Sequence, residues 1–132
     1  MSLIRWIDFA TRGDERGYLV ALEANKNIPF DIKRVYYLTG MKKDVPRGFH
    51  AHKELHQVAI CLSGKCILKM DDGKTKSEVW LDSMAKGLII PPMVWHEMHE
   101  FSENCVLMVL ASEYYDESDY IRDYQEFQNR VI

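Results

Sequence analysis

The sequence predicts an all-β fold, a sandwich or barrel of short strands, followed by one short helix near the C-terminal end. Turn-forming residues recur along the chain, with glycines at positions 13, 17, 40, 48, 64, 73 and 87 and prolines at 91 and 92. The runs between them are short and rich in β-branched and aromatic residues, which favour strands. Many short strands at this spacing are typical of sandwiches and barrels.

The predicted strands are residues 18–23, 32–39, 57–62, 66–70, 78–81, 88–90 and 105–111. Residues 65–70 and 74–81 form a predicted hairpin around Asp71-Asp72-Gly73, because an Asp-Gly pair supplies the positive φ angles of a tight turn. The run 105–111 (CVLMVLA) is apolar on both of its faces. It is therefore expected at the centre of a sandwich, or under a second subunit.

The end of the chain has a different pattern. Tyr120, Ile121, Tyr124 and Phe127 recur at helical spacing, and Ser118 precedes them as a candidate N-cap. We therefore expect a short C-terminal helix whose aromatic side chains pack against the rest of the protein.

Size and composition indicate one globular domain, residues 1–132, with 47% hydrophobic and 28% charged residues. The net charge of −3 argues against broad nucleic-acid binding. No apolar run is long enough to cross a bilayer, so neither nucleic acid nor a membrane is an expected partner. Cys61, Cys66 and Cys105 are odd in number and widely spaced, as expected for reduced thiols in a cytoplasmic protein.

The most informative segment is residues 46–57, PRGFHAHKELHQ. His50 and His52 are two positions apart, so on a strand their side chains share one face. Two imidazoles on one face can bind a metal ion or transfer protons near neutral pH. The residues alone leave both possibilities open.

His50 and His52 are followed by Gln57 and Gly64, and a second segment, residues 91–96 (PPMVWH), ends in His96. The two segments resemble the two motifs of the cupins, which fold as a double-stranded β-helix, a jelly-roll barrel. Metal-binding cupins carry a glutamate where this chain has Gln57, and the second motif has a glycine where this chain has Met93. An amide is a weaker ligand than a carboxylate for divalent metals, so we expect a cupin barrel without a metal. Histidines free of metal can act as general acid and base.

The resemblance extends over nearly the whole chain. The segments that carry it are residues 16–19 (RGYL), 27–37 (NIPFDIKRVYY), 47–52 (RGFHAH) and 120–124 (YIRDY). Together they are similar to the WxcM-like sugar-nucleotide 3,4-ketoisomerases. The resemblance implies an isomerase of deoxysugar and glycan biosynthesis that converts dTDP-4-keto-6-deoxy-D-glucose to a dTDP-3-keto-6-deoxyhexose through an enediol. It also implies that no cofactor is needed, and that the protein is a homodimer with exchanged N-terminal strands.

The resemblance assigns catalysis to His52 and His50. His52 is the expected base for the C3 proton, and His50 is expected to shuttle a proton or hold a sugar oxygen. The other expected substrate contacts are Arg47, Tyr37, Arg34, Gln57, His96 and Trp95. A pleated strand puts Tyr36 and Tyr37 on opposite faces, and the sequence leaves open which one faces the site.

Two other functional classes stay open from the residues. One is a metal-dependent cupin enzyme, either a dioxygenase or an isomerase. The other is a non-catalytic sugar-binding cupin. The configuration of the product at C4 is also open, because it depends on which face of the enediol is reprotonated, and hence on side-chain placement to within about an ångström.

Overall fold

The structure is a computed structural model that describes residues 3–132. Its elements, in chain order, are β1 (Trp6–Asp8), β2 (Arg12–Asp14), β3 (Gly17–Leu19), β4 (Arg34–Leu38), β5 (Arg47–His52), β6 (Gln57–Ser63), β7 (Cys66–Asp71), β8 (Lys76–Leu81), β9 (Lys86–Ile90), β10 (Trp95–His99), β11 (Val106–Ala111), the 3-10 turn η1 (Glu117–Asp119), β12 (Tyr120–Ile121) and α1 (Tyr124–Arg130).

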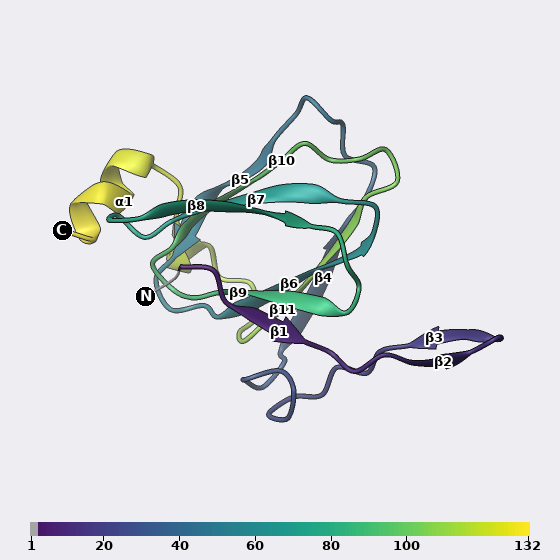
Figure 1. The fold of residues 1–132 in the computed structure, drawn as a ribbon. Coiled ribbons are helices and arrows are strands. Elements are labelled where there is room, and N and C mark those ends of the chain that lie inside the picture. Colours follow the sequence, from purple (N-terminus) through teal and green to yellow (C-terminus); the bar gives the residue numbers. More distant parts are fainter. Residues whose placement is uncertain (1–2) are drawn as a thin grey trace.

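Two five-stranded antiparallel sheets face each other and enclose the core (Figure 1). One sheet has the strand order β1-β9-β6-β11-β4 and the other β12-β5-β10-β7-β8. Successive strands such as β5 and β6 lie in different sheets, so the chain winds between the two layers. This arrangement confirms the predicted all-β jelly-roll barrel of cupin type with a short C-terminal helix.

Strand β11 lies in the interior of its sheet, between β6 and the edge strand β4, as its apolar sequence predicted. Leu107 and Val109 point into the core between the sheets. Leu110 points outward, where it packs with Phe9 and Ile28 from the N-terminal part of the same chain. The outer face of β11 therefore does not depend on a second subunit for its cover.

The N-terminal region differs from the prediction for residues 18–23. Only Gly17–Leu19 form a strand, which pairs with β2 in a hairpin that extends away from the barrel (Figure 1). Val20 and Leu22 leave this hairpin and pack instead on the outer apolar cluster. Strand β10 was not predicted, because its sequence WHEMH has too few β-branched residues to be distinguished.

The predicted hairpin around Asp71-Asp72-Gly73 is confirmed. Strands β7 and β8 pair from Asp71 with Lys76 onward, and the Asp72 N–H donates to the carbonyl of Thr75 at 3.2 Å. The Asp72 carboxylate also accepts the N–H groups of Lys74 and Thr75. The side chain thereby holds the turn closed.

The C-terminal helix is confirmed, but it begins later than the sequence suggested. Asp123, and not Ser118, is its N-cap, because the Asp123 carboxylate accepts the N–H groups of the first helical turn. Ser118 lies in η1, and Tyr120 and Ile121 form β12 on the edge of β5. The helical spacing of the aromatic residues was misleading, since two different elements supply them.

The described cysteines are all buried and unpaired, as expected of reduced thiols. Within residues 3–132, no helix has the length and apolar character that crossing a membrane requires.

Candidate active site

Three histidines meet inside one end of the barrel. His50 and His52 come from β5, and His96 comes from the adjacent strand β10, where it lies directly opposite His50. The ring centroid of His50 is 5.0 Å from that of His52 and 4.6 Å from that of His96. Each ring offers a nitrogen within 4.8 Å of the others. The structure therefore brings together the histidines of both sequence motifs.

A β-bulge in β5 orients His50. Gly48 and Phe49 both have positive φ angles, 94° and 62°, and the register of β5 against β10 shifts at this point. A Cβ atom on Gly48 would lie 3.0 Å from the carbonyl oxygen of His96, so glycine is needed here. The bulge aims the Gly48 carbonyl at His50 Nδ1, 3.1 Å away.

Two of the rings have their tautomers set by backbone carbonyls. Gly48 O accepts from His50 Nδ1, and Val94 O accepts from His96 Nδ1 at 3.2 Å. A carbonyl can only accept, so the proton of each neutral ring must be on Nδ1. The Nε2 atoms of His50 and His96 are then left with a free lone pair.

Burial keeps this cluster uncharged at neutral pH. Desolvation, followed by the charges of His50 and Arg34, lowers the pKa of His52 to about 3. Desolvation, followed by the charge of His50, lowers the pKa of the deeply buried His96 to about 3. The pKa of His50 is also lowered by burial, against a smaller opposing effect of the Gly48 carbonyl. Neutral imidazoles are able to accept protons, as a general base must.

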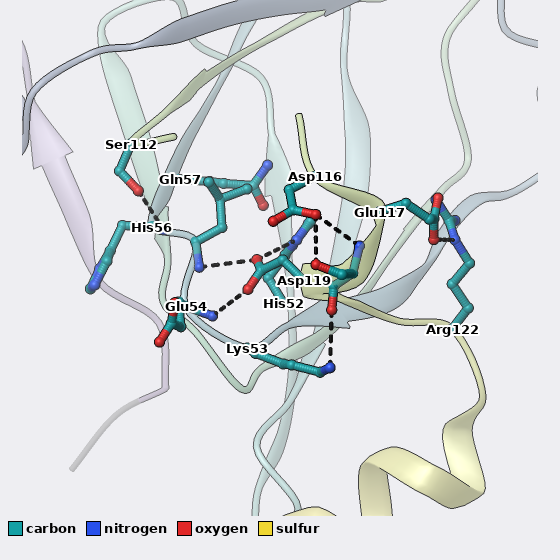
Figure 2. A network of polar contacts seen from close by, with 12 residues as sticks. His52, Lys53, Glu54, His56, Gln57, Ser112, Asp116, Glu117, Asp119 and Arg122 are labelled. Carbon is teal, nitrogen blue, oxygen red and sulfur yellow. Dashed lines mark hydrogen bonds and ion pairs between the residues drawn. The ribbon is translucent and has the colours of Figure 1, made fainter. Parts of the chain in front are cut away.

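The C-terminal segment forms one wall of the cluster. Tyr120 on β12 pairs with His52, and its ring centroid lies 4.3 Å from that of His52 and 4.9 Å from that of His50. The guanidinium of Arg122 stacks over the Tyr120 ring at 4.2 Å. Arg122 is itself held by the Glu117 carboxylate, 2.8 Å from its Nε (Figure 2).

His52 is one of the residues that line a cavity of about 710 Å³, a size typical of ligand sites. Its walls include the rings of Phe30, Tyr115 and Tyr120. Arg34 lies in the same wall, with its guanidinium 5.1 Å from the Tyr36 ring and 5.7 Å from the Tyr115 ring. The buried Nε of Arg34 has no hydrogen-bond partner among the described residues. The positively charged side chain of Arg34 therefore lies in the same cavity wall as His52.

Gln57 and Tyr36 form a pair on the facing sheet. The Gln57 Nε2 group donates to the Tyr36 hydroxyl oxygen at 2.6 Å. Burial raises the pKa of Tyr36 to about 12, so the phenol keeps its proton. Because the oxygen already accepts from Gln57, the Tyr36 O–H is free to donate to a bound molecule.

The structure resolves the choice between the two neighbouring tyrosines. Tyr36 faces inward to Gln57, whereas the side chain of Tyr37 is 70% exposed on the outer face of β4. Neither tyrosine lines the cavity at His52, but Tyr36 is the one that faces the interior of the barrel.

Four other expected contacts also do not line this cavity: Gln57 and His96, described above, and Arg47 and Trp95. Arg47 is exposed at the first residue of β5, opposite Met98, and does not line the cavity. Trp95 is buried against Tyr124 and Phe127, where its Nε1 donates to Glu97 at 2.9 Å. Trp95 therefore anchors the C-terminal helix to the barrel.

The sequence analysis missed three residues of this site. Tyr36 was named there only as the neighbour of Tyr37, and the sequence carries no signal to choose between them. Tyr120 lies in the segment 120–124 that carried the family resemblance, which was the available signal. Asp119 precedes it, 3.3 Å from His52, and was hidden by the expectation of a helix.

Nearly the whole chain matches a family model. The model is FdtA, described as WxcM-like, C-terminal, and it matches residues 2–131. The chain belongs to this family. A curated relative, the TDP-4-oxo-6-deoxy-alpha-D-glucose-3,4-oxoisomerase of Aneurinibacillus thermoaerophilus, is 58% identical over 125 residues, which cover 95% of this chain and 90% of that protein.

Solved structures of similar proteins agree with this membership. A histidine variant of the 3,4-ketoisomerase QdtA from Thermoanaerobacterium thermosaccharolyticum, in complex with TDP-4-keto-6-deoxyglucose, is 45% identical with a TM-score of 0.96. That match covers 99% of this chain and 95% of QdtA. A 3,4-ketoisomerase from Helicobacter canadensis has the same identity and TM-score, over 99% of this chain and 98% of that one.

Proposed function

We propose that this protein is a sugar-nucleotide 3,4-ketoisomerase that converts TDP-4-keto-6-deoxyglucose to the TDP-linked 3-keto sugar. The observation that carries the proposal is the cluster of three uncharged imidazoles, of which His52 lines a cavity of about 710 Å³. The family relatives support it, because proteins with this named activity are 58% and 45% identical to the chain.

The chemistry requires only proton transfers. The carbonyl at C4 acidifies the hydrogen on C3, so a base can remove it. The C–H electron pair becomes the C3=C4 double bond, and the C4 oxygen takes up a proton to give an enediol. Loss of the proton from the C3 hydroxyl and addition of a proton to C4 complete the isomerisation. Protons and electrons balance, so no redox cofactor is required.

His52 is the proposed base, acting through Nε2. Its low pKa in the free protein keeps it unprotonated, and the negative charge that develops on the enediolate raises its basicity during the reaction. His50 is proposed to carry a proton to or from the sugar oxygens, since its Nδ1 is occupied by the Gly48 carbonyl and its Nε2 is free.

Other residues of the site are proposed to hold the substrate. Arg34 is the proposed contact for phosphate or enediolate charge, because its guanidinium lines the cavity beside His52. Tyr36 is proposed to donate to a sugar oxygen and Gln57 to fix the Tyr36 hydroxyl. His96 is proposed to hold the ring of His50 in position from the neighbouring strand β10. The charge-assisted contacts of an arginine suit a diphosphate.

We further propose that catalysis runs without a metal ion. Three imidazole nitrogens at this spacing are able to hold a divalent cation, which would polarise the carbonyl. The group contains no carboxylate, however, and the amide of Gln57 occupies the position of the cupin glutamate. Such a donor set favours the metal-free proton transfer.

We propose a homodimer in which the β2–β3 hairpin of each chain reaches the other barrel. The hairpin extends away from its own barrel, and Tyr18 and Leu19 on it are 75% and 58% exposed. Strand β4 is an open sheet edge whose outward residues Val35 and Tyr37 are also exposed. An exposed edge with apolar side chains is a ready site for another strand.

The unpaired thiols support a cytoplasmic location.

The proposal is tested by incubating the purified protein with TDP-4-keto-6-deoxyglucose and following the sugar by NMR. The expected result is loss of the C3 proton signal in D₂O and appearance of a 3-keto product, whose coupling constants give the configuration at C4. If the protein binds TDP but neither exchanges the C3 proton for deuterium nor forms a 3-keto product, the result would instead support the non-catalytic sugar-binding alternative.

A further inference from the structure

His52 differs from the other two histidines in what lies against its Nδ1 atom. His50 and His96 face neutral backbone carbonyls. His52 faces a carboxylate, with its Nδ1 3.3 Å from Asp119 Oδ2 (Figure 2). His52 is 2% exposed and the Asp119 side chain 18%, so water weakens this contact little.

The Asp119 carboxylate is fixed by the loop that follows His52. One oxygen accepts the N–H of Glu54 at 2.9 Å, and the other accepts the N–H of Leu55 at 3.3 Å. The backbone carbonyl of Asp119 accepts the N–H of Lys53. Three successive residues after the histidine thus enclose the aspartate, and the carboxylate cannot turn away from the ring.

In the free protein the His52–Asp119 contact is close but not aligned as a hydrogen bond, and neither ring nitrogen of His52 has a hydrogen-bond partner among the described residues. At 3.3 Å the two atoms are near enough that rotation of the ring would let Nδ1–H donate to the fixed carboxylate oxygen. Catalytic hydrogen bonds commonly tighten in this way when substrate binds.

We infer that Asp119 is the positioning residue of the catalytic base. An ionised carboxylate only accepts, so it selects the tautomer of His52 that carries its proton on Nδ1 and leaves Nε2 free. When Nε2 takes the C3 proton, the carboxylate stabilises the resulting imidazolium, which a neutral carbonyl does less strongly. The carboxylate of Asp119 therefore supports the assignment of His52, and not His50 or His96, as the proposed base. This inference rests on the proposed ketoisomerase function.

The test is Asp119→Asn, which preserves size and keeps one oxygen that can accept the N–H of Glu54. The amide can donate to His52 Nδ1 and so favours the opposite tautomer. We expect kcat to fall by about 10²- to 10⁴-fold, the range for losing a general base, with KM changed little. We also expect the ¹⁵N chemical shifts of His52 to move from the Nδ1–H to the Nε2–H pattern.

Asp123→Asn is the matched control, because Asp123 caps α1 and touches neither His52 nor the cavity. It should keep wild-type kcat and the wild-type His52 tautomer. A purely structural role for Asp119 predicts a lower Tm in Asp119→Asn with the tautomer unchanged, and that result would overturn the inference, as would unchanged kcat.

The tautomer of His52 is measured without turnover. If wild-type protein fails to isomerise the substrate, the proposed function fails, while the ¹⁵N shifts still decide whether Asp119 sets the tautomer.

Discussion

His50 lies directly opposite His96 in the pairing of β5 with β10, and their ring centroids are 4.6 Å apart. His50 begins the first histidine motif and His96 ends the second, so the two motifs are separate in sequence but form one cluster in space. The bulge at Gly48 and Phe49 shifts the register of β5 against β10 next to the pair of His50 and His96. The cluster is consequently a property of the barrel and not of either motif alone.

Removing the proposed base should nearly abolish isomerisation. We expect His52→Asn to be inactive and His50→Asn to be severely reduced, since loss of a general acid or base typically costs about 10²- to 10⁴-fold. The measurement is the rate of 3-keto product formation by NMR, with circular dichroism to verify the fold. His99→Asn is the control, because His99 pairs with Glu97 away from the cluster and should remain active. Full activity in His52→Asn would remove it as the base.

Chelation should leave the enzyme active. The proposed mechanism moves only protons, and the histidine group contains no carboxylate to retain a divalent ion. After exhaustive EDTA treatment and removal of the chelator, we expect the turnover rate to match that of untreated protein. If EDTA eliminates turnover and added zinc, iron or manganese restores it, the metal-dependent cupin alternative is correct.

The sequence could predict features that depend on neighbouring residues, but not features that depend on contacts between distant segments of the chain. The barrel and the His50–His52 pair were predictable because alternation and turn residues are local signals. Tyr36, Asp119 and Tyr120 were not, because their roles depend on which strand lies beside β5. Ile121 and Phe127 show the difficulty, since both are buried members of one helix-like pattern although one is in a strand and the other in a helix.

Acid should destabilise the protein through its buried histidines. The pKa values of His52 and His96 are lowered to about 3 in the folded state, against about 6.5 when unfolded. The unfolded state therefore binds more protons below pH 6.5, and stability is lost as pH falls from 6.5 toward 3. Between pH 7 and pH 5 we expect each histidine to contribute a loss of about 2 kcal/mol.

This loss is measured as the free energy of unfolding in urea at several pH values. His96→Asn removes one of the two groups, so the slope of stability against pH should become shallower even if the variant is less stable overall. An equal slope in the variant and the wild type between pH 5 and pH 7 would contradict the assignment of His96 as a buried neutral base.

Arginine at position 34 should be specifically required for nucleotide binding. TDP should raise the Tm of the wild-type protein, and Arg34→Lys should reduce this shift and raise KM, because lysine cannot make the planar bidentate contacts of a guanidinium. Arg47→Lys is the comparison, since Arg47 does not line the cavity, and it should have the smaller effect. Added salt should not remove the difference between Arg34→Lys and wild type. A TDP shift that is the same in both variants and the wild type would exclude Arg34 as a phosphate contact.

Assembly should depend on the β2–β3 hairpin and on the open edge of β4. Light scattering at micromolar concentration should give the mass of a dimer for the wild-type protein. Leu19→Asp on the hairpin and Val35→Asp on the edge should each shift the mass toward a monomer, because each places a charge where the proposed interface buries an apolar group. Val45→Asp changes a similarly exposed residue away from both elements and should remain dimeric. The outer face of β11 is already covered within its own chain, so the proposed interface rests on these two elements alone. A monomeric wild-type protein, or dimers that survive both charged substitutions, would exclude the proposed exchange.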